Sequence, residues 1–324
     1  MTQSDRNLRT GRLLGAGLLA SVMAACGGGG GGDDPLGDIG VTVANQDALT
    51  RAAMVSLAGG LATDGLTLSG RSGVSAIGSR VKALAASDSG RKRAAALTTP
   101  IVEPCVLSGS TTTFYDDVNN NGTLDLNEPL TVVFTACRDD SLAPDQEING
   151  TLVASITAAR STGLTISTSA QAYTTTWTGH SLRLDGGFTM AIDAISATTG
   201  RTVIGIGNAL VIEAVTPVWA DRITLQAGYQ AVLAVDTSAG STSTTASGTV
   251  RSDAAGGYVT TRTVEPVLQF LSDPYPRSGR VQVFGRTGSL QATVLSSSQV
   301  QVDLDADGNG TYEASKILGW DQIL

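Results

Sequence analysis

Residues 281–304 read VQVFGRTGSLQATVLSSSQVQVDL, and this stretch sets the pattern that the fold follows. Apolar and polar residues alternate in three runs that begin at Val281, Leu290 and Val300 and are separated by Gly, Ser or Gln. A period of two places apolar side chains on one face of a strand and polar side chains on the other. The runs therefore predict antiparallel strands with one face in water, and the same pattern already occurs from Leu130 to Phe134.

The alternation continues from Ile101 to the end of the chain, and no helix-like pattern of useful length interrupts it. We therefore predict one all-β domain over residues 100–324, an antiparallel meander that curls into a barrel-like or sandwich shape and so avoids long bare edges. Paired glycines at 186–187 and 256–257 indicate turns. Asn149-Gly150 is a strong signal for a two-residue hairpin turn.

The region before the strands has a helical character. Residues 43–61 predict a short helix that begins near Asn45 or Asp47, and residues 74–84 predict a second one. Both are expected to cover one face of the sheet, and residues 85–99 are expected to form a linker. The predicted organisation is a signal peptide at 1–25, a tether at 26–42, short helices with the linker at 43–99, and the β domain at 100–324.

Charge and composition exclude some classes of partner. The chain has 324 residues with a net charge of −8, 41% hydrophobic and 4% aromatic residues. Basic residues gather only in the short run from Arg91 to Arg93, so no nucleic-acid partner is expected.

The N-terminus has the order of a secretion signal. It begins with three basic residues, Arg6, Arg9 and Arg12. An apolar stretch too short to span a bilayer follows from Leu13 to Val22, and a small-residue cleavage site follows from Met23 to Cys26. This resembles the signal peptide and lipobox of bacterial lipoproteins, although Met23 stands where Leu is usual. The resemblance implies that Cys26 is the lipidated first residue of the mature chain, followed by a Gly-rich tether. An ordinary signal peptide cut near Ala25, or an uncleaved anchor, are the alternatives.

Lipidation implies an exported protein held in the bacterial cell envelope, at the outer membrane, with the membrane as its partner. If Cys26 carries lipid, Cys105 and Cys137 remain as an even pair among the three cysteines. In an oxidising compartment such a pair predicts a disulfide, with two free buried thiols as the alternative.

A twelve-residue segment between these cysteines has the spacing of a calcium loop. Its candidate ligands are Asp117, Asn119, Asn121, Thr123 through its carbonyl, Asp125 and Glu128. Gly122 supplies backbone freedom where the turn is sharpest. The segment resembles the EF-hand calcium loop over these twelve residues only, because its flanks are β-branched and aromatic. It predicts a Ca²⁺ site that joins two strands; a polar Asn/Gly hairpin turn is the alternative.

A second, shorter copy follows near the C-terminus. Its candidate ligands are Asp305, Asp307, Asn309, Thr311 and Glu313. Lys316 occupies the closing position, where a carboxylate is expected, so Asp303 on the preceding strand is the candidate substitute. The alternative for Asp303 is a place on the polar face of that strand.

No pattern names a substrate. The single histidine, His180, lies in a segment that lacks the glycine pattern of a nucleophile elbow. The first functional hypothesis is a non-catalytic envelope lipoprotein whose Ca²⁺ and disulfide are structural and which serves surface binding or assembly. A carrier of an apolar ligand inside the curled sheet and a hydrolase are the second and third.

Overall fold

The computed structural model describes residues 37–59, 100–119, 125–138, 145–270 and 272–324. Pro35–Leu324 form one compact unit. The leader with Cys26, the second predicted helix at 74–84, the linker at 85–99, and Asn121 to Thr123 of the first loop lie outside the described residues.

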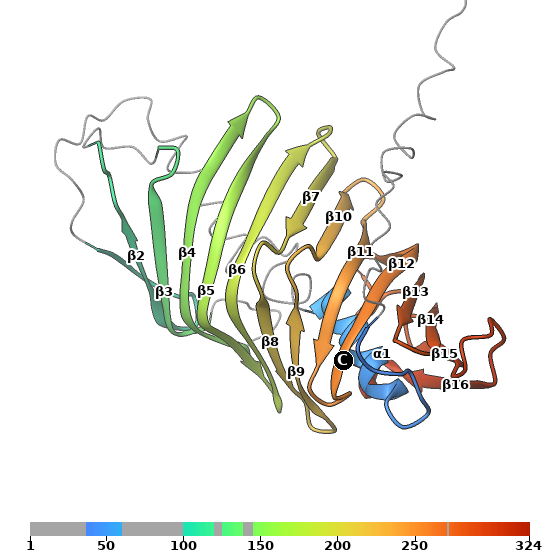
Figure 1. Cartoon of the computed structure of the whole chain (residues 1–324). Helices are drawn as coiled ribbons and strands as arrows, with labels where there is room; N and C mark the ends of the chain where they lie inside the picture. The colour runs from blue at the N-terminus through green and yellow to red at the C-terminus, as the bar shows by residue number, and fades with distance from the viewer. Residues whose placement is uncertain (1–36, 60–99, 120–124, 139–144, 271) are drawn as a thin grey trace, which may run out of the picture. The chain divides into compact units, whose positions relative to one another are not determined.

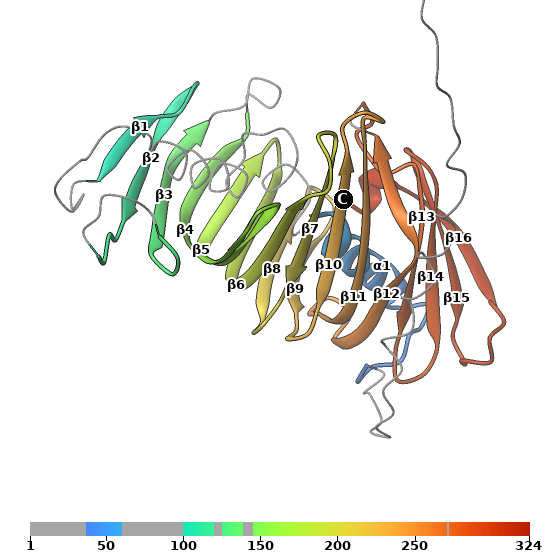
Figure 2. The ribbon, with the colours of Figure 1, turned by 90° about the horizontal axis from the view of Figure 1, so that it is seen from above.

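The described chain forms one antiparallel sheet of sixteen strands. The strands are β1 (Ile101–Pro104), β2 (Ser108–Tyr115), β3 (Pro129–Arg138), β4 (Glu147–Arg160), β5 (Gly163–Trp177), β6 (His180–Ala194), β7 (Thr199–Gly205), β8 (Leu210–Val215), β9 (Ala220–Leu225), β10 (Gln230–Asp236), β11 (Ser241–Ser252), β12 (Gly257–Phe270), β13 (Ser278–Phe284), β14 (Ser289–Ser296), β15 (Gln299–Asp305) and β16 (Ala314–Gly319). The sheet curls, as Figures 1 and 2 show, so the predicted all-β meander is confirmed.

The meander contains two interrupted strands. β7 and β8 both pair with β6, while β9 and β10 both pair with β11. Each pair is therefore one long strand broken at residues 206–209 or 226–229. The two breaks face each other, because Ile206 donates its N–H to the Tyr229 carbonyl and accepts from Gly228. Every successive long strand thus lies beside the one before it.

A short N-terminal helix packs against the sheet. It comprises α1 (Gln46–Met54) and a π-helical turn, η1 (Val55–Gly59), which match the first predicted helix. α1 packs against β9, β11, β13 and β14, and its apolar side buries Leu49, Ala52 and Ala53. Tyr229 is buried beneath η1 and donates its hydroxyl to the Ser56 carbonyl at 3.0 Å. Burial raises the pKa of Tyr229, so this hydroxyl stays protonated and holds the helix to the sheet.

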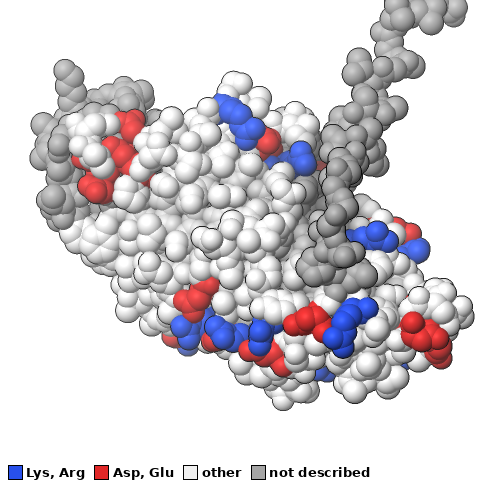
Figure 3. Space-filling view, in the orientation of Figure 1, with Lys and Arg blue, Asp and Glu red and all other residues white. Residues whose placement is uncertain are grey.

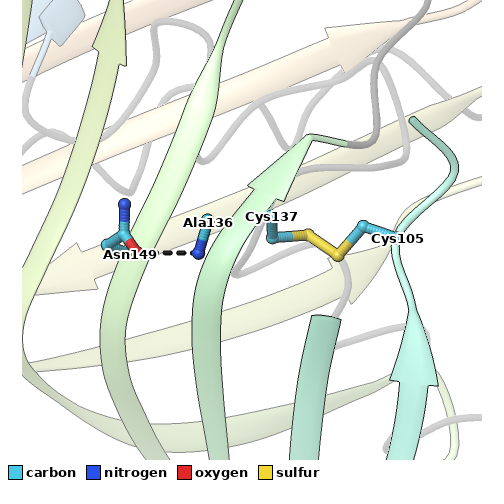
Figure 4. Close-up of a disulfide and its surroundings, with 4 residues drawn as sticks. All are labelled: Cys105, Ala136, Cys137 and Asn149. Atoms are coloured by element: carbon cyan, nitrogen blue, oxygen red, sulfur yellow. Dashed lines mark hydrogen bonds between the residues drawn. A yellow bond between two sulfur atoms is a disulfide. The ribbon is translucent and has the colours of Figure 1, made fainter. Parts of the chain in front are cut away.

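The Asn149-Gly150 pair is not a hairpin turn, and this part of the sequence prediction is wrong. Both residues lie inside β4, where Gly150 has φ +104°. The Asn149 side-chain oxygen accepts the N–H of Ala136 on β3 at 2.8 Å (Figure 4). Ala136 itself has φ +45°, in a bulge where the pairing of β3 with β4 shifts register. This kind of bulge uses positive φ and a nearby side-chain acceptor, as a hairpin turn does. The sequence Asn-Gly therefore suits a bulge of this kind as well as a turn.

The same device recurs in other strands. Ala172 of β5 has φ +48° and donates its N–H to the Asp185 carboxylate on β6 at 2.6 Å. Gly186 follows with φ +125°, inside β6 rather than in the turn predicted at 186–187. On β11, Ala246 donates to the Thr263 hydroxyl of β12 at 2.8 Å. Bulges increase local bending, and Figure 1 shows the long strands β4 to β6 curving along their length.

We expect Gly150→Ala to destabilise the domain by about 2 kcal/mol or more, since a Cβ is disfavoured at positive φ and has no room here. A Cβ at Gly150 would lie 2.2 Å from the Ala172 carbonyl oxygen. The control is Gly207→Ala, where an added Cβ meets nothing within 4 Å. Urea unfolding of both variants checks the prediction, and equal midpoints would contradict the role of the bulges.

Candidate metal centres

The first calcium-type loop joins β2 to β3, and its two acidic ends are buried. The exposed fraction is 6% for Asp117 and 4% for Glu128. One Glu128 oxygen, Oε2, accepts the N–H of Asp125 at 2.8 Å, and Asn119 donates its side-chain amide to Asp125 at 2.6 Å. The other oxygen, Oε1, is buried without a hydrogen-bond partner within the described part of the chain.

A buried carboxylate oxygen without a partner is costly, and a bound cation removes that cost. Glu128 stands at the closing position of the loop, where Ca²⁺ is usually held by both oxygens of a carboxylate. The described ends of the loop therefore have the buried, acidic character that a cation site needs. The residues that would complete the shell, Asn121 and Thr123, lie outside the described residues.

The second loop joins β15 to β16 and is hydrogen-bonded throughout. Asp305, 4% exposed, accepts backbone N–H groups from Gly308, Asn309 and Gly310 at 2.7 to 3.1 Å. Asn309 also donates its backbone and side-chain N–H groups to Asp307, and its own oxygen accepts from Thr311. Carboxylate oxygens of Asp305, Asp307 and Glu313 lie within 4.8 Å of one another, so this group can hold a metal ion. The loop is already shaped by its own hydrogen bonds.

Two residues considered with the second loop have other contacts. Asp303 accepts hydrogen bonds from Gln301 and Ser315, on the polar face of β15 and β16. Lys316 forms an ion pair with Asp47 and so joins β16 to α1. The sequence pattern does not reveal this pair, because 269 residues separate its members.

The predicted disulfide is present. Cys105 and Cys137 are bonded with a Cα–Cα distance of 5.5 Å (Figure 4). Cys105 lies in the turn between β1 and β2, and Cys137 lies near the end of β3. The bond therefore fastens the first hairpin of the sheet to its third strand. The first calcium-type loop connects β2 and β3 at the opposite end of the same strands.

His180 lies beside the turn between β5 and β6. Its ring stacks on Trp177, with ring centroids 5.3 Å apart, and its Nδ1 contacts the Thr178 carbonyl at 2.9 Å. Asp145 accepts hydrogen bonds from the hydroxyl and the N–H of Thr178, which lower the pKa of its carboxyl group. These contacts stabilise neighbouring turns, and the stacking of Trp177 on His180 is visible only in the structure.

Comparison of the chain with protein-family models, with curated proteins and with solved structures found no match in any of the three. In the part of the chain that the structure describes, no helix is both long and apolar enough to cross a membrane.

Proposed function

We propose that this protein is a non-catalytic, lipid-anchored component of the bacterial cell envelope. Its β domain, stabilised by the disulfide and by Ca²⁺, presents the edge strand β1 (Ile101–Pro104) for surface binding or assembly. The observation that carries the proposal is the position of β1. It is the first strand in the hydrogen-bonding order, as β16 is the last, and within the described sheet it pairs with β2 alone.

Several features of the β1 edge support this role. All four β1 residues are exposed, including Ile101 at 37% and Val102 at 62%. The apolar part of β1, Ile101 and Val102, can pair with a strand from a partner, whereas Glu103 and Pro104 restrict that pairing to this part of the strand. The disulfide braces this edge through the β1–β2 turn, and the first calcium-type loop braces β2 against β3. Cross-links at an edge are useful where a partner binds, because a preorganised strand loses less conformational entropy on binding.

The two alternatives have less support. α1 and η1 occupy space against β9, β11, β13 and β14, which reduces the sheet surface that an apolar ligand could contact. A hydrolase needs convergent titratable groups. His180 instead contacts Trp177 and the Thr178 carbonyl, and Asp145 accepts a hydrogen bond from Thr178. Both side chains therefore make contacts that stabilise turns.

A photo-crosslinking experiment in cells tests the proposal. The full chain is produced with p-benzoylphenylalanine in place of Val102, and in a second strain in place of Ile195, which is 65% exposed in the turn after β6. We expect a crosslinked adduct of the Val102 position in the membrane fraction and none from Ile195, because only the edge strand meets the partner. Cys26→Ser is expected to prevent lipidation at this position, and globomycin is expected to leave the leader attached, which shows as a larger chain in the membrane fraction. Equal crosslinking at both positions, or none at Val102, would refute the edge as the binding surface.

A further inference from the structure

The first described residues of the chain lie against one end of the sheet. We call it the entry rim and define it by the turns at residues 178–179, 216–219, 253–256 and 285–288. Asp38 donates its N–H to the Tyr258 carbonyl beside the β11–β12 turn. Val41 donates its N–H to the Thr287 carbonyl in the β13–β14 turn. The described chain therefore begins against this rim.

The rim also includes the turns after β5 and β8, because the strands are antiparallel. Ser252, at the end of β11, pairs with Ile223 near the start of β9. Ser181, at the start of β6, pairs with Val215 at the end of β8. The two turns touch: a Cβ added at Gly179 would lie 3.3 Å from the Pro217 ring.

Chain length limits how far the entry rim can lie from a lipid at Cys26. Gly37 follows Cys26 by eleven residues, and a chain of that length spans at most roughly 40 Å even when it is fully extended. A strand of fourteen residues such as β12 spans roughly 46 Å. The entry rim is therefore favoured to lie at the bilayer, and the opposite rim is held away from it.

The β8–β9 turn carries apolar side chains on this rim. Val215 is 46% exposed and Val218 is 67% exposed. The turn is held in shape by Thr216, whose N–H bonds to the Trp219 carbonyl at 2.8 Å and whose hydroxyl accepts the Trp219 N–H at 3.1 Å. Beside it, Trp177 and His180 are stacked. Exposed valines with an adjacent tryptophan suit the interface between lipid headgroups and acyl chains.

Charged residues lie behind these apolar tips. Arg183 and Arg222 both contact Glu213, at 3.5 and 3.7 Å. Arg183 also pairs with Asp185, and Arg251 pairs with Asp253. The exposed Arg286 in the β13–β14 turn is offset by the exposed Asp38 on the same rim, so the arginines and acids balance. Figure 3 shows red and blue side chains interspersed in a row across the lower part of this face. The rim therefore lacks the excess positive charge that selects anionic lipids.

We propose that the entry rim, led by Val215 and Val218, is a lipid-facing surface that rests on the headgroup region of a zwitterionic bilayer. The inference rests on the lipid anchoring in the proposed function. Two exposed valines bind a bilayer weakly by themselves, so the tether must supply the effective concentration. The rim then orients the domain, and the β1 edge is presented to a partner from a fixed position.

The test uses the chain from Cys26 onward, coupled through the Cys26 thiol to a maleimide lipid in phosphatidylcholine vesicles. Cys105 and Cys137 do not compete, because they are bonded to each other. Amide hydrogen exchange measured by mass spectrometry should slow by roughly tenfold across residues 214–222 on coupling, since lipid contact excludes water and suppresses local opening. The turn at residues 195–198, on the opposite rim, should not change.

A matched pair of variants sharpens the test. Val218→Asp should abolish the slowing, because a carboxylate is poorly accommodated at the lipid interface. Ile195→Asp, an equal change on the opposite rim, should preserve it. Unchanged exchange on coupling, protection of residues 195–198 instead, or protection that needs anionic lipid would each overturn the proposal. Coupling is chemical, so the result does not depend on whether cells lipidate Cys26, and failure of the anchor is detected separately by globomycin.

Discussion

Replacing both Cys105 and Cys137 with serine should lower the free energy of unfolding by roughly 3 to 4 kcal/mol. The bond closes a loop of 32 residues in sequence separation, and in the chain-entropy model its loss releases that loop in the unfolded state. The native state loses little, because β1 to β3 remain hydrogen-bonded to one another. Urea unfolding of the wild type with and without dithiothreitol, and of the double variant, gives the difference.

The double variant is its own control for the reductant. Dithiothreitol should lower the urea midpoint of the wild type and leave that of the variant unchanged. If protein isolated from the envelope carries two alkylatable thiols, the bond does not form in the cell and the stability argument fails. A midpoint that is equal in all samples would contradict the argument from loop entropy in the unfolded state.

Calcium should raise the thermal midpoint of the β domain, and Glu128→Gln should remove most of the gain. A ligand that binds only the folded state stabilises it by about 2.7 kcal/mol at about 100 times its Kd. Glu128 is 4% exposed, and its Oε1 lacks a hydrogen-bond partner in the described residues. A bound cation would therefore both contact this oxygen and neutralise the buried charge. The amide of glutamine removes that charge. Affinity in the millimolar range would require millimolar Ca²⁺ in the titration.

Further variants locate the effect. Glu313→Gln in the second loop should remove less of the gain, because that loop is already shaped by the hydrogen bonds of Asp305 and Asp307. Glu265 lies on β12, away from both loops, and pairs with Arg280 of β13. Glu265→Gln therefore controls for the general effect of removing one carboxylate charge. Lys316→Ala should lower the midpoint by the same amount with and without Ca²⁺, because Lys316 is paired with Asp47 and carries no oxygen that could bind the ion. If EGTA followed by excess Ca²⁺ leaves the wild-type midpoint unmoved, both loops are plain polar turns.

Local patterns were sufficient to predict much of this fold. The period of two over residues 281–304 corresponds to β13, β14 and β15, with Val281, Leu290 and Val300 buried as expected. The first helix follows from Leu49 and its apolar neighbours, and the disulfide follows from counting cysteines. Alternation and cysteine parity are short-range or compositional properties, so they can be seen without knowing which strands meet.

Other features depend on contacts between strands that are distant in the sequence. Asn149-Gly150 has the sequence of a turn, and only the approach of Ala136 and Ala172 makes it part of a bulge. The pairing of Lys316 with Asp47 joins opposite ends of the described chain.

The sequence by itself therefore determined the fold class, the antiparallel meander, the cysteine pair and the spacing of both calcium-type loops, because each follows from a short-range pattern or from composition. The tertiary structure alone decided where the sheet bends, that β7 pairs with β10, that β1 and β16 are the terminal strands, and that the described chain begins at the rim that carries Val215 and Val218. The physical reason is that hydrogen-bond partners in a sheet come from other strands, so positive φ at Gly150 or exposure at Val218 acquires its meaning only from the neighbours that the fold supplies.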